Sequence, residues 1–145
     1  HCIMHTHTVA GCAAASLREP LKNIDFHGIM FSERIAHHDF EGITTREEEC
    51  KRLAKSLGNK GAMILRNHGL LSVGETIAHA FIRLHNLQMA CEIQIKARAV
   101  NDETITVNDS IAKDHADAIE NSDKGELAFN AMVRLMEKID PSFKN

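Results

Sequence analysis

Residues 75–99 constrain the fold more than any other segment, because they contain neither glycine nor proline and carry a helical hydrophobic repeat. The apolar residues of the repeat recur every three or four positions: Ile77, Phe81, Leu84, Leu87, Cys91 and Ile95. This spacing places them on one face of a helix with about 3.6 residues per turn. The segment is therefore predicted to form a long amphipathic helix that packs on a core.

Two short apolar runs upstream of this helix are predicted to be buried strands. The first is Cys2–Met4 and the second is GAMIL at 61–65, and polar residues follow each of them. An alanine-rich segment at 9–17 and an apolar repeat at 50–57 predict helices, whereas residues 24–43 suit short strands or loop. Strands that alternate with helices indicate an α/β domain.

The last third of the chain is predicted to add two helices behind this domain, at residues 110–121 and 126–139. Capping boxes are predicted at two helix starts: Thr44 with Glu47, and Asp123 with Glu126. We therefore divide the chain into a domain at 1–100 and a helical C-terminal extension at 101–145.

The composition excludes several classes of protein. The 145 residues carry a formal charge of −3, and they contain no arginine-rich run or basic aromatic cluster, so nucleic acid is not an expected partner. The longest apolar runs fall far short of the roughly 20 residues that a membrane span needs. Four widely spaced cysteines without a CxxC pair predict free thiols and a cytoplasmic protein.

Two histidines at the end of the first predicted strand, His5 and His7, are candidate metal ligands. Alternate residues of a strand project to one face, so the two imidazoles are expected to point the same way. The chain contains ten histidines, so about one such pair is expected by chance. Scattered surface histidines are therefore the competing interpretation.

A third histidine, His68, follows the second predicted strand. Strand ends in α/β domains commonly carry functional residues, although the Asn67-His68-Gly69 sequence is also typical of a turn. Together with His5 and His7 it would complete a three-histidine site with an open coordination position, as catalytic zinc prefers. Such a metal acts as a Lewis acid that polarises a carbonyl or stabilises an enolate.

The remaining titratable clusters are expected to be structural. They are the helix residues His79, His85 and His115, the acidic run Glu47-Glu48-Glu49, and the pair His37-His38 beside Asp39. A double histidine of this kind is typical of an exposed strand end, with a place near the site as the alternative. The helix histidines are predicted to lie on the surface. The acidic run is predicted to form a solvated first helical turn, which the helix dipole favours.

Two blocks of the sequence resemble the class II aldolase/adducin family. The metal-binding strand and following helix of that family are similar to CIMHTHTVAG at residues 2–11. A later block of the family is similar to ILRNHGLLSVGETIAHAF, which runs on through IRLH into NLQMACEIQIKA and spans residues 64–97. The resemblance covers about residues 1–100, and GETIAHAF and ACEIQ look closer to the adducin-like branch.

The resemblance implies a three-layer αβα sandwich, assembled as a homotetramer, with zinc or another divalent metal on His5, His7 and His68. This metal would bind the hydroxyl and carbonyl oxygens of the substrate and stabilise an enediolate. The N-terminal part of the family domain, with an acidic residue and phosphate-binding loops, is expected to lie upstream of this chain. Fuculose-phosphate-type aldolases present a tyrosine from the neighbouring subunit; this chain has no Tyr, and His27 beside Phe26 is the candidate proton donor in that region.

Three interpretations of function follow. The first is a metal-dependent aldolase-like lyase, or a related enolate-forming epimerase or dehydratase, acting on a small hydroxy-carbonyl or sugar-phosphate substrate. The alternative is a non-catalytic adducin-like module for oligomerisation and interaction. The third is a structural fragment without an activity of its own.

Overall fold

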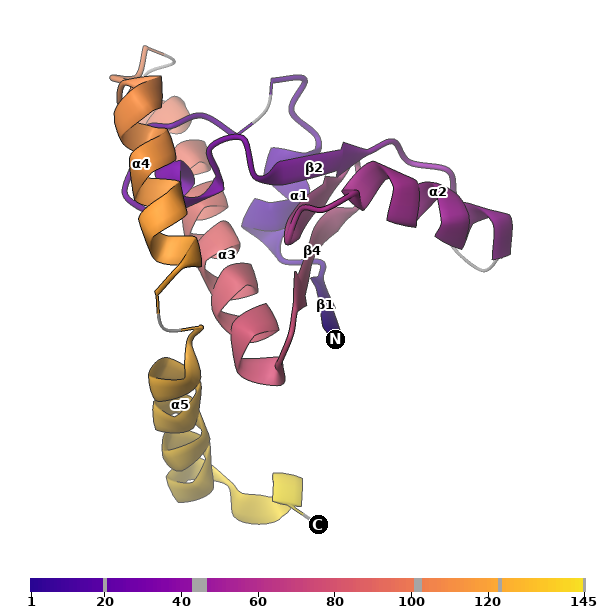
Figure 1. Ribbon diagram of the computed structural model, residues 1–145, viewed down its shortest axis with the longest axis vertical. Coiled ribbons are helices and arrows are strands. Elements are labelled where there is room, and N and C mark those ends of the chain that lie inside the picture. The colour runs from indigo at the N-terminus through magenta and orange to yellow at the C-terminus, as the bar shows by residue number, and fades with distance from the viewer. Residues whose placement is uncertain (20, 43–46, 101–102, 123, 145) are drawn as a thin grey trace.

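The computed structural model describes residues 1–145 except 20, 43–46, 101–102, 123 and 145 (Figure 1). Its elements are β1 (Cys2–Thr6), α1 (Val9–Ala15), the 3-10 helix η1 (Gly28–Phe31), β2 (Ile35–His38), α2 (Glu47–Leu57), β3 (Ala62–Leu65), β4 (Gly69–Gly74), α3 (Ile77–Val100), α4 (Asp109–Glu120), α5 (Glu126–Ile139) and the 3-10 helix η2 (Pro141–Lys144). They confirm the predicted α/β class. The capping boxes predicted at Thr44 and Asp123 lie outside the described residues.

The four strands form one mixed sheet in the order β1-β4-β3-β2. β3 and β4 form an antiparallel hairpin, β1 pairs antiparallel with β4, and β2 runs parallel to β3. Thr6, the last residue of β1, lies opposite Leu70, the second residue of β4. The C-terminal end of β1 therefore lies beside the β3–β4 turn, although the two segments are far apart in the sequence.

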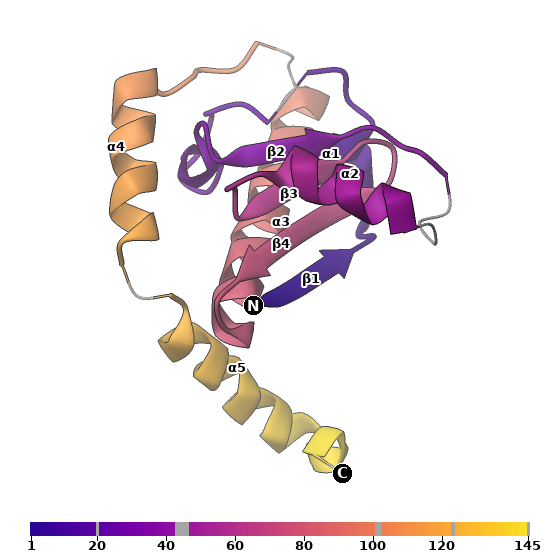
Figure 2. The same ribbon diagram turned by 45° about the vertical axis from the view of Figure 1, so that its right-hand side comes forward.

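Helices cover both faces of the sheet and give the three layers of an αβα sandwich (Figure 2). α1 and α3 pack on one face, where they form a core with Ile64 of β3 and Leu70 of β4. α2 packs on the other face, where Leu53 contacts the core that contains Met63 of β3. Because side chains alternate along a strand, β3 supplies both cores, which explains its unbroken apolar run.

The long helix predicted for residues 75–99 is confirmed as α3. Leu87 and Cys91, near its middle, are fully buried. The predicted surface position is wrong for His79, which is only 6% exposed. Its ring turns back towards the start of the helix, where Nδ1 lies 3.5 Å from the Glu75 backbone nitrogen. Neither α3 nor any other described helix is long and apolar enough to cross a membrane.

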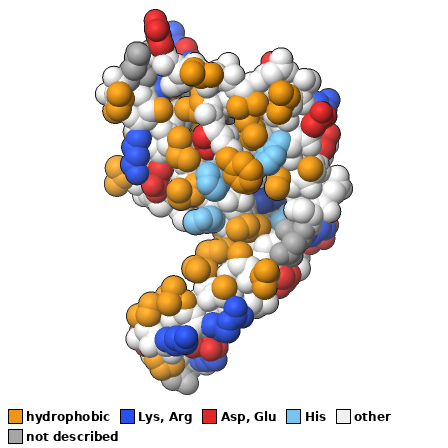
Figure 3. All heavy atoms as spheres, turned by 90° about the vertical axis from the view of Figure 1, so that its left-hand side faces the viewer, with side chains coloured by type: hydrophobic (Ala, Val, Ile, Leu, Met, Phe, Trp, Pro, Cys, Tyr) orange, Lys and Arg blue, Asp and Glu red, His pale blue; other side chains and the backbone are white. Residues whose placement is uncertain are grey.

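The two predicted C-terminal helices are present as α4 and α5. Ion pairs join α4 to the rest of the domain, and they include Arg34 with Asp117, Arg83 with Glu120 and Lys113 with Glu33. α5 projects from the body of the molecule without a buried residue, and apolar side chains cover much of its surface (Figure 3). The exposed apolar residues of this end of the chain include Leu127, Leu135, Ile139 and Phe143. The domain boundary at residue 100 stays a prediction.

Candidate metal centre

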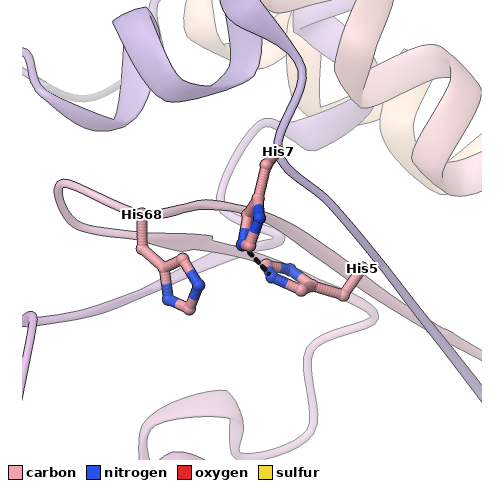
Figure 4. A group of neighbouring side chains, drawn as sticks. All are labelled: His5, His7 and His68. Carbon is pink, nitrogen blue, oxygen red and sulfur yellow. Dashed lines mark hydrogen bonds between the residues drawn. The ribbon is translucent and has the colours of Figure 1, made fainter. Parts of the chain in front are cut away.

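The end of β1 positions the first two candidate ligands. His5 is the fourth residue of β1 and His7 follows Thr6, so the two imidazoles leave the chain on the same side, as predicted (Figure 4). Thr8 then caps α1, because its Oγ1 accepts a hydrogen bond from the backbone N–H of Gly11 at 3.2 Å. This cap fixes where the chain turns after His7.

The third candidate, His68, lies in the turn that joins β3 to β4. Asn67 before it has a φ of +54°, a left-handed conformation that asparagine tolerates. The Asn67 backbone N–H donates to the Ala15 carbonyl at 3.0 Å, and the Cys12 thiol donates to the His68 carbonyl at 3.0 Å. Two contacts with α1 therefore hold this turn at the end of β1. The segment after β3 is a hairpin turn, as the sequence Asn67-His68-Gly69 allows; the functional role of His68 stays a prediction.

The three imidazoles converge on one point (Figure 4). Each offers a nitrogen, and these nitrogens all lie within 4.8 Å of one another. His5 Nε2 and His7 Nε2 are 2.7 Å apart, which is a hydrogen-bond distance. Within the part of the chain that the structure describes, no other group of three or more histidine, cysteine or carboxylate side chains is close enough to share a metal ion. The structure thus brings together the three histidines named from the sequence.

A main-chain contact sets the orientation and the tautomer of His5. Its Nδ1 lies 2.8 Å from the carbonyl oxygen of Leu70. Since a carbonyl oxygen can only accept, Nδ1 carries the proton and donates it. In the neutral imidazole, Nε2 of His5 is then an acceptor directed at His7. A histidine that donates through one nitrogen and directs the other inward has the arrangement of a metal ligand.

The surroundings of His68 favour the form that a metal requires. Partial burial lowers the pKa of His68 below its ordinary value of 6.5, and positive charge on His5 and His7 lowers it further. Glu49 acts in the opposite direction and raises it, but this is the smallest of the four effects. The His68 imidazole is therefore neutral at pH 7, and metal coordination needs a neutral imidazole.

The chemistry of the three side chains fits a divalent transition metal. Three imidazoles with a free fourth position is a ligand set of catalytic zinc. Nitrogens around a tetrahedral zinc lie about 3.3 Å apart, as follows from bond lengths of about 2.0–2.1 Å. The 2.7 Å contact between His5 and His7 needs only a small rotation of the rings to reach that spacing.

A cavity of about 220 Å³ opens beside the cluster, between α2 and the sheet. Its lining joins His5 and His68 to His38 and Glu49, which sequence analysis assigned to structural roles. Both of these residues are buried, at 9% and 4% exposure. The predicted solvated position is therefore wrong for Glu49. The sequence held a signal for its burial, because Glu49 precedes the apolar Leu53 by one helical turn and so shares its face.

The structure does not bring His27 to the cluster or to this cavity. Its ring contacts Phe26, and Phe26 in turn contacts His115 of α4. The His27 backbone N–H donates to the Asp25 carboxylate at 2.8 Å. A contribution of His27 to a metal site would therefore have to come from a second copy of the chain.

Residues 1–95 match the family model of the class II aldolase and adducin N-terminal domain. The chain belongs to this family. The matched region contains β1, the β3–β4 turn and most of α3, so it includes all three histidines of the cluster. The resemblance inferred from the two sequence blocks is confirmed.

Curated relatives of this class II aldolase/adducin chain fall into two groups. A protein of Pseudomonas aeruginosa, provisionally named an aldolase class 2 protein, is 32% identical over 149 residues, covering 99% of this chain and 58% of that protein. Alpha-adducin of Rattus norvegicus is 46% identical over 99 residues, covering 68% of this chain and 13% of that protein. The chain thus spans less than two thirds of the length of these relatives.

Solved structures of the family share the fold. An aldolase II superfamily protein from Pseudomonas syringae superposes with a TM-score of 0.90 and 35% identity, covering 99% of this chain and 59% of that one. The L-fuculose 1-phosphate aldolase from Glaciozyma antarctica PI12 gives 0.81 and 26%, covering 97% of this chain and 53% of that one. The predicted class II aldolase sandwich, with helices behind it, is therefore confirmed.

Proposed function

We propose that this chain carries the metal site of a class II aldolase-type lyase acting on a small hydroxy-carbonyl or sugar-phosphate substrate. The observation that carries the proposal is the convergence of His5, His7 and His68. These imidazoles would hold a divalent ion, with zinc the first choice for three nitrogen ligands. When bound, such an ion supplies the Lewis acidity that polarises a carbonyl oxygen.

The chain prepares this site through contacts that need no ligand. The Leu70 carbonyl holds His5 with the free lone pair turned inward. The Cys12 thiol fixes the main chain at His68, whose imidazole stays neutral because burial lowers its pKa. Ligands whose positions are already fixed lose little conformational freedom on binding, which favours tight coordination.

Proton transfer in a lyase requires a group that the cluster does not supply. We propose that this group comes from outside the described site, either as an acidic residue in the remaining part of the family domain or as His27 of a second copy in a homo-oligomer. The length of the relatives supports the first source, since this chain covers 58% of the Pseudomonas aeruginosa protein. The separation of His27 from the cluster within one copy is consistent with the second.

Metal analysis of the purified chain tests the proposal. We expect one zinc per chain, and His5→Ala or His68→Ala should weaken zinc binding by more than the roughly 10–100-fold that loss of an outer-shell partner alone causes. His85→Ala is the matched control, because His85 is exposed on α3 and lies outside the cluster. Absence of bound zinc, or equal zinc affinity in all variants, would refute the metal site.

A second candidate function is a non-catalytic adducin-like interaction module. It is favoured by the 46% identity to alpha-adducin and by the unburied apolar surface of α5. This function predicts self-association that does not depend on the imidazoles. Light scattering should then give the same oligomer for the parent chain and for the variant with alanine at all three histidines. Dissociation of that variant would count against the module.

A further inference from the structure

The cavity between α2 and the sheet faces the histidine cluster from one side. His5 lies opposite Leu71 in the β1–β4 ladder, and both residues line the cavity. His68 lines it from the β3–β4 turn. A molecule that reaches the cluster through this cavity would therefore touch α2 as well as the metal ligands.

The walls of the cavity combine apolar surface with two buried polar groups. Phe40, Leu53 and Leu65 supply the apolar part. His38 and Glu49 are buried to more than nine tenths and supply the polar part. A lining of apolar walls with a few fixed polar groups is typical of small-molecule sites.

His38 is already engaged by protein groups. Its Nδ1 lies 2.9 Å from Ser56 Oγ, and its Nε2 lies 3.4 Å from a Glu41 carboxylate oxygen. Glu41 in turn accepts from Arg52, whose single Nε–H lies 2.9 Å from both carboxylate oxygens and whose Nη2 also donates to one of them. This network holds His38 and Glu41 in place, and it largely neutralises the charge of Glu41.

The charge that remains along the wall is negative. Among the lining residues that the structure describes, Arg66 is the one Lys or Arg, and its guanidinium donates to the main-chain carbonyl of Leu17 at 2.7 Å, beyond α1. Within that described lining, no Lys or Arg is directed at the carboxylates of Glu49 and Asp39. Arg52 lies outside the lining; it pairs with Glu41 and also acts electrostatically on Glu49. Glu49 also lies in the first turn of α2, where the helix dipole stabilises negative charge.

We propose that this cavity binds the uncharged, hydroxyl-bearing end of the substrate and excludes a phosphate group, with Glu49 accepting a hydrogen bond from a substrate hydroxyl. The inference rests on the proposed function, because it takes the carbonyl end of the same molecule to lie at His5 and His68. A phosphate in this position would meet the carboxylates of Glu49 and Asp39, and the described lining offers it no Lys or Arg side chain directed into the cavity. A hydroxyl group instead supplies the donor that a buried carboxylate requires.

The volume is consistent with a short substrate. The cavity measures about 220 Å³, below the roughly 300–1,000 Å³ that is common for small-molecule pockets. This size favours a short hydroxy-carbonyl chain over a longer sugar. Glu49 is then the residue that selects between neutral and phosphorylated forms of one carbon skeleton.

Methyl NMR on the zinc-loaded chain tests the inference at the cavity itself, because Leu53 and Leu65 methyl groups line it. The probes are dihydroxyacetone and dihydroxyacetone phosphate, which share one carbon skeleton. We expect dihydroxyacetone to shift these methyl signals with an apparent Kd at least about tenfold lower than that of the phosphate ester. Equal or tighter binding of the ester at these methyl groups would overturn the inference.

Glu49→Gln keeps the size of the side chain and removes its charge. We expect it to weaken dihydroxyacetone binding about tenfold and to reduce the discrimination against the ester. Glu48→Gln is the matched control, because Glu48 is its exposed neighbour on α2 and should leave both constants unchanged. Asp39→Asn, at an exposed position of the lining, should reduce the discrimination about threefold, and it provides a test that does not alter a buried group. Unchanged discrimination in both Glu49→Gln and Asp39→Asn would overturn the inference.

Zinc content measured on the same samples separates this inference from the proposed function. A chain that binds zinc but does not discriminate between the probes would refute the role of the cavity and leave the metal site intact. A chain that binds no zinc but still binds dihydroxyacetone through Glu49 would refute the metal site and support the cavity. Neither zinc nor probe binding would refute both.

Discussion

Gly69, the first residue of β4, is the position where a single added carbon should disturb the metal site most directly. A Cβ at this residue would lie 2.3 Å from the Thr6 carbonyl oxygen, 3.1 Å from His7 Cδ2 and 3.3 Å from His5 Cε1. Ordinary van der Waals contact begins at 3.4 Å. The main chain at Thr6, between the two ligands His5 and His7, would therefore have to move away by about 1 Å.

The expected magnitudes follow from that displacement. Overpacking of a tight contact costs about 1–3 kcal/mol, so the free energy of unfolding of Gly69→Ala should fall by that amount. Metal sites tolerate ligand displacements of only about 0.2 Å, so zinc affinity should fall by at least about tenfold. Urea denaturation of the metal-free chain measures the first effect. Competition with a chromogenic chelator measures the second.

Gly58→Ala separates loss of stability from loss of the site. Gly58 follows α2 with a φ of +58°, and nothing lies within 4 Å of an added Cβ. The left-handed conformation makes alanine cost about 1–2 kcal/mol there, without any contact with the histidines. Zinc affinity should therefore stay at the parent value. If Gly69→Ala binds zinc as tightly as Gly58→Ala at comparable stability, the contact of Gly69 with β1 does not control zinc affinity.

Other residues give three further predictions. Burial, and then the charge of Arg83, lowers the pKa of His79 below 6.5, so the unfolded chain binds more protons as the pH falls through about 6.5. The urea midpoint of the metal-free chain should therefore decrease from about pH 7 to about pH 5.5, and the decrease should be smaller in His79→Gln; an equal decrease would contradict this origin. Burial raises the pKa of the Cys91 thiol to about 12, so iodoacetamide followed by mass spectrometry should modify the exposed Cys50 and leave Cys91 free in the folded chain. Leu87→Ala should lower the free energy of unfolding by about 2–5 kcal/mol in denaturant titrations, because Leu87 is fully buried; a loss below about 1 kcal/mol would show that the core collapses around the gap.

Elements with a strong local repeat were predicted closely from the sequence. α3 extends from Ile77 to Val100, against a prediction of residues 75–99, and the GAMIL strand is found as Ala62–Leu65. A helical repeat marks the first segment, and an unbroken apolar run marks the second. No repeat dominates residues 24–43, so the sequence predicts only short strands or loop there. In the structure this segment contains η1 and β2. The place of β2 beside β3 depends on pairing with a distant strand, which local sequence does not encode.

Burial of polar side chains was predicted less well. Glu49 and His79 were both assigned to the surface on the basis of residue type, and both are buried. Glu49 shares its helix face with the apolar Leu53, and His79 lies at the start of α3 with its ring turned to the Glu75 backbone. The position on the helix decided burial in these two cases, and residue type alone did not.

The candidate site, too, depends partly on local sequence and partly on tertiary structure. The spacing of His5 and His7 by itself determined that both imidazoles would leave one side of a strand, because side chains alternate with a period of two. Only the tertiary structure decided that His68 meets them and that Glu49 faces the same cavity. These contacts depend on the register of β1 against β4 and on which face of the sheet α2 covers. A local repeat fixes which side chains share a face, whereas the pairing of distant segments decides which faces meet.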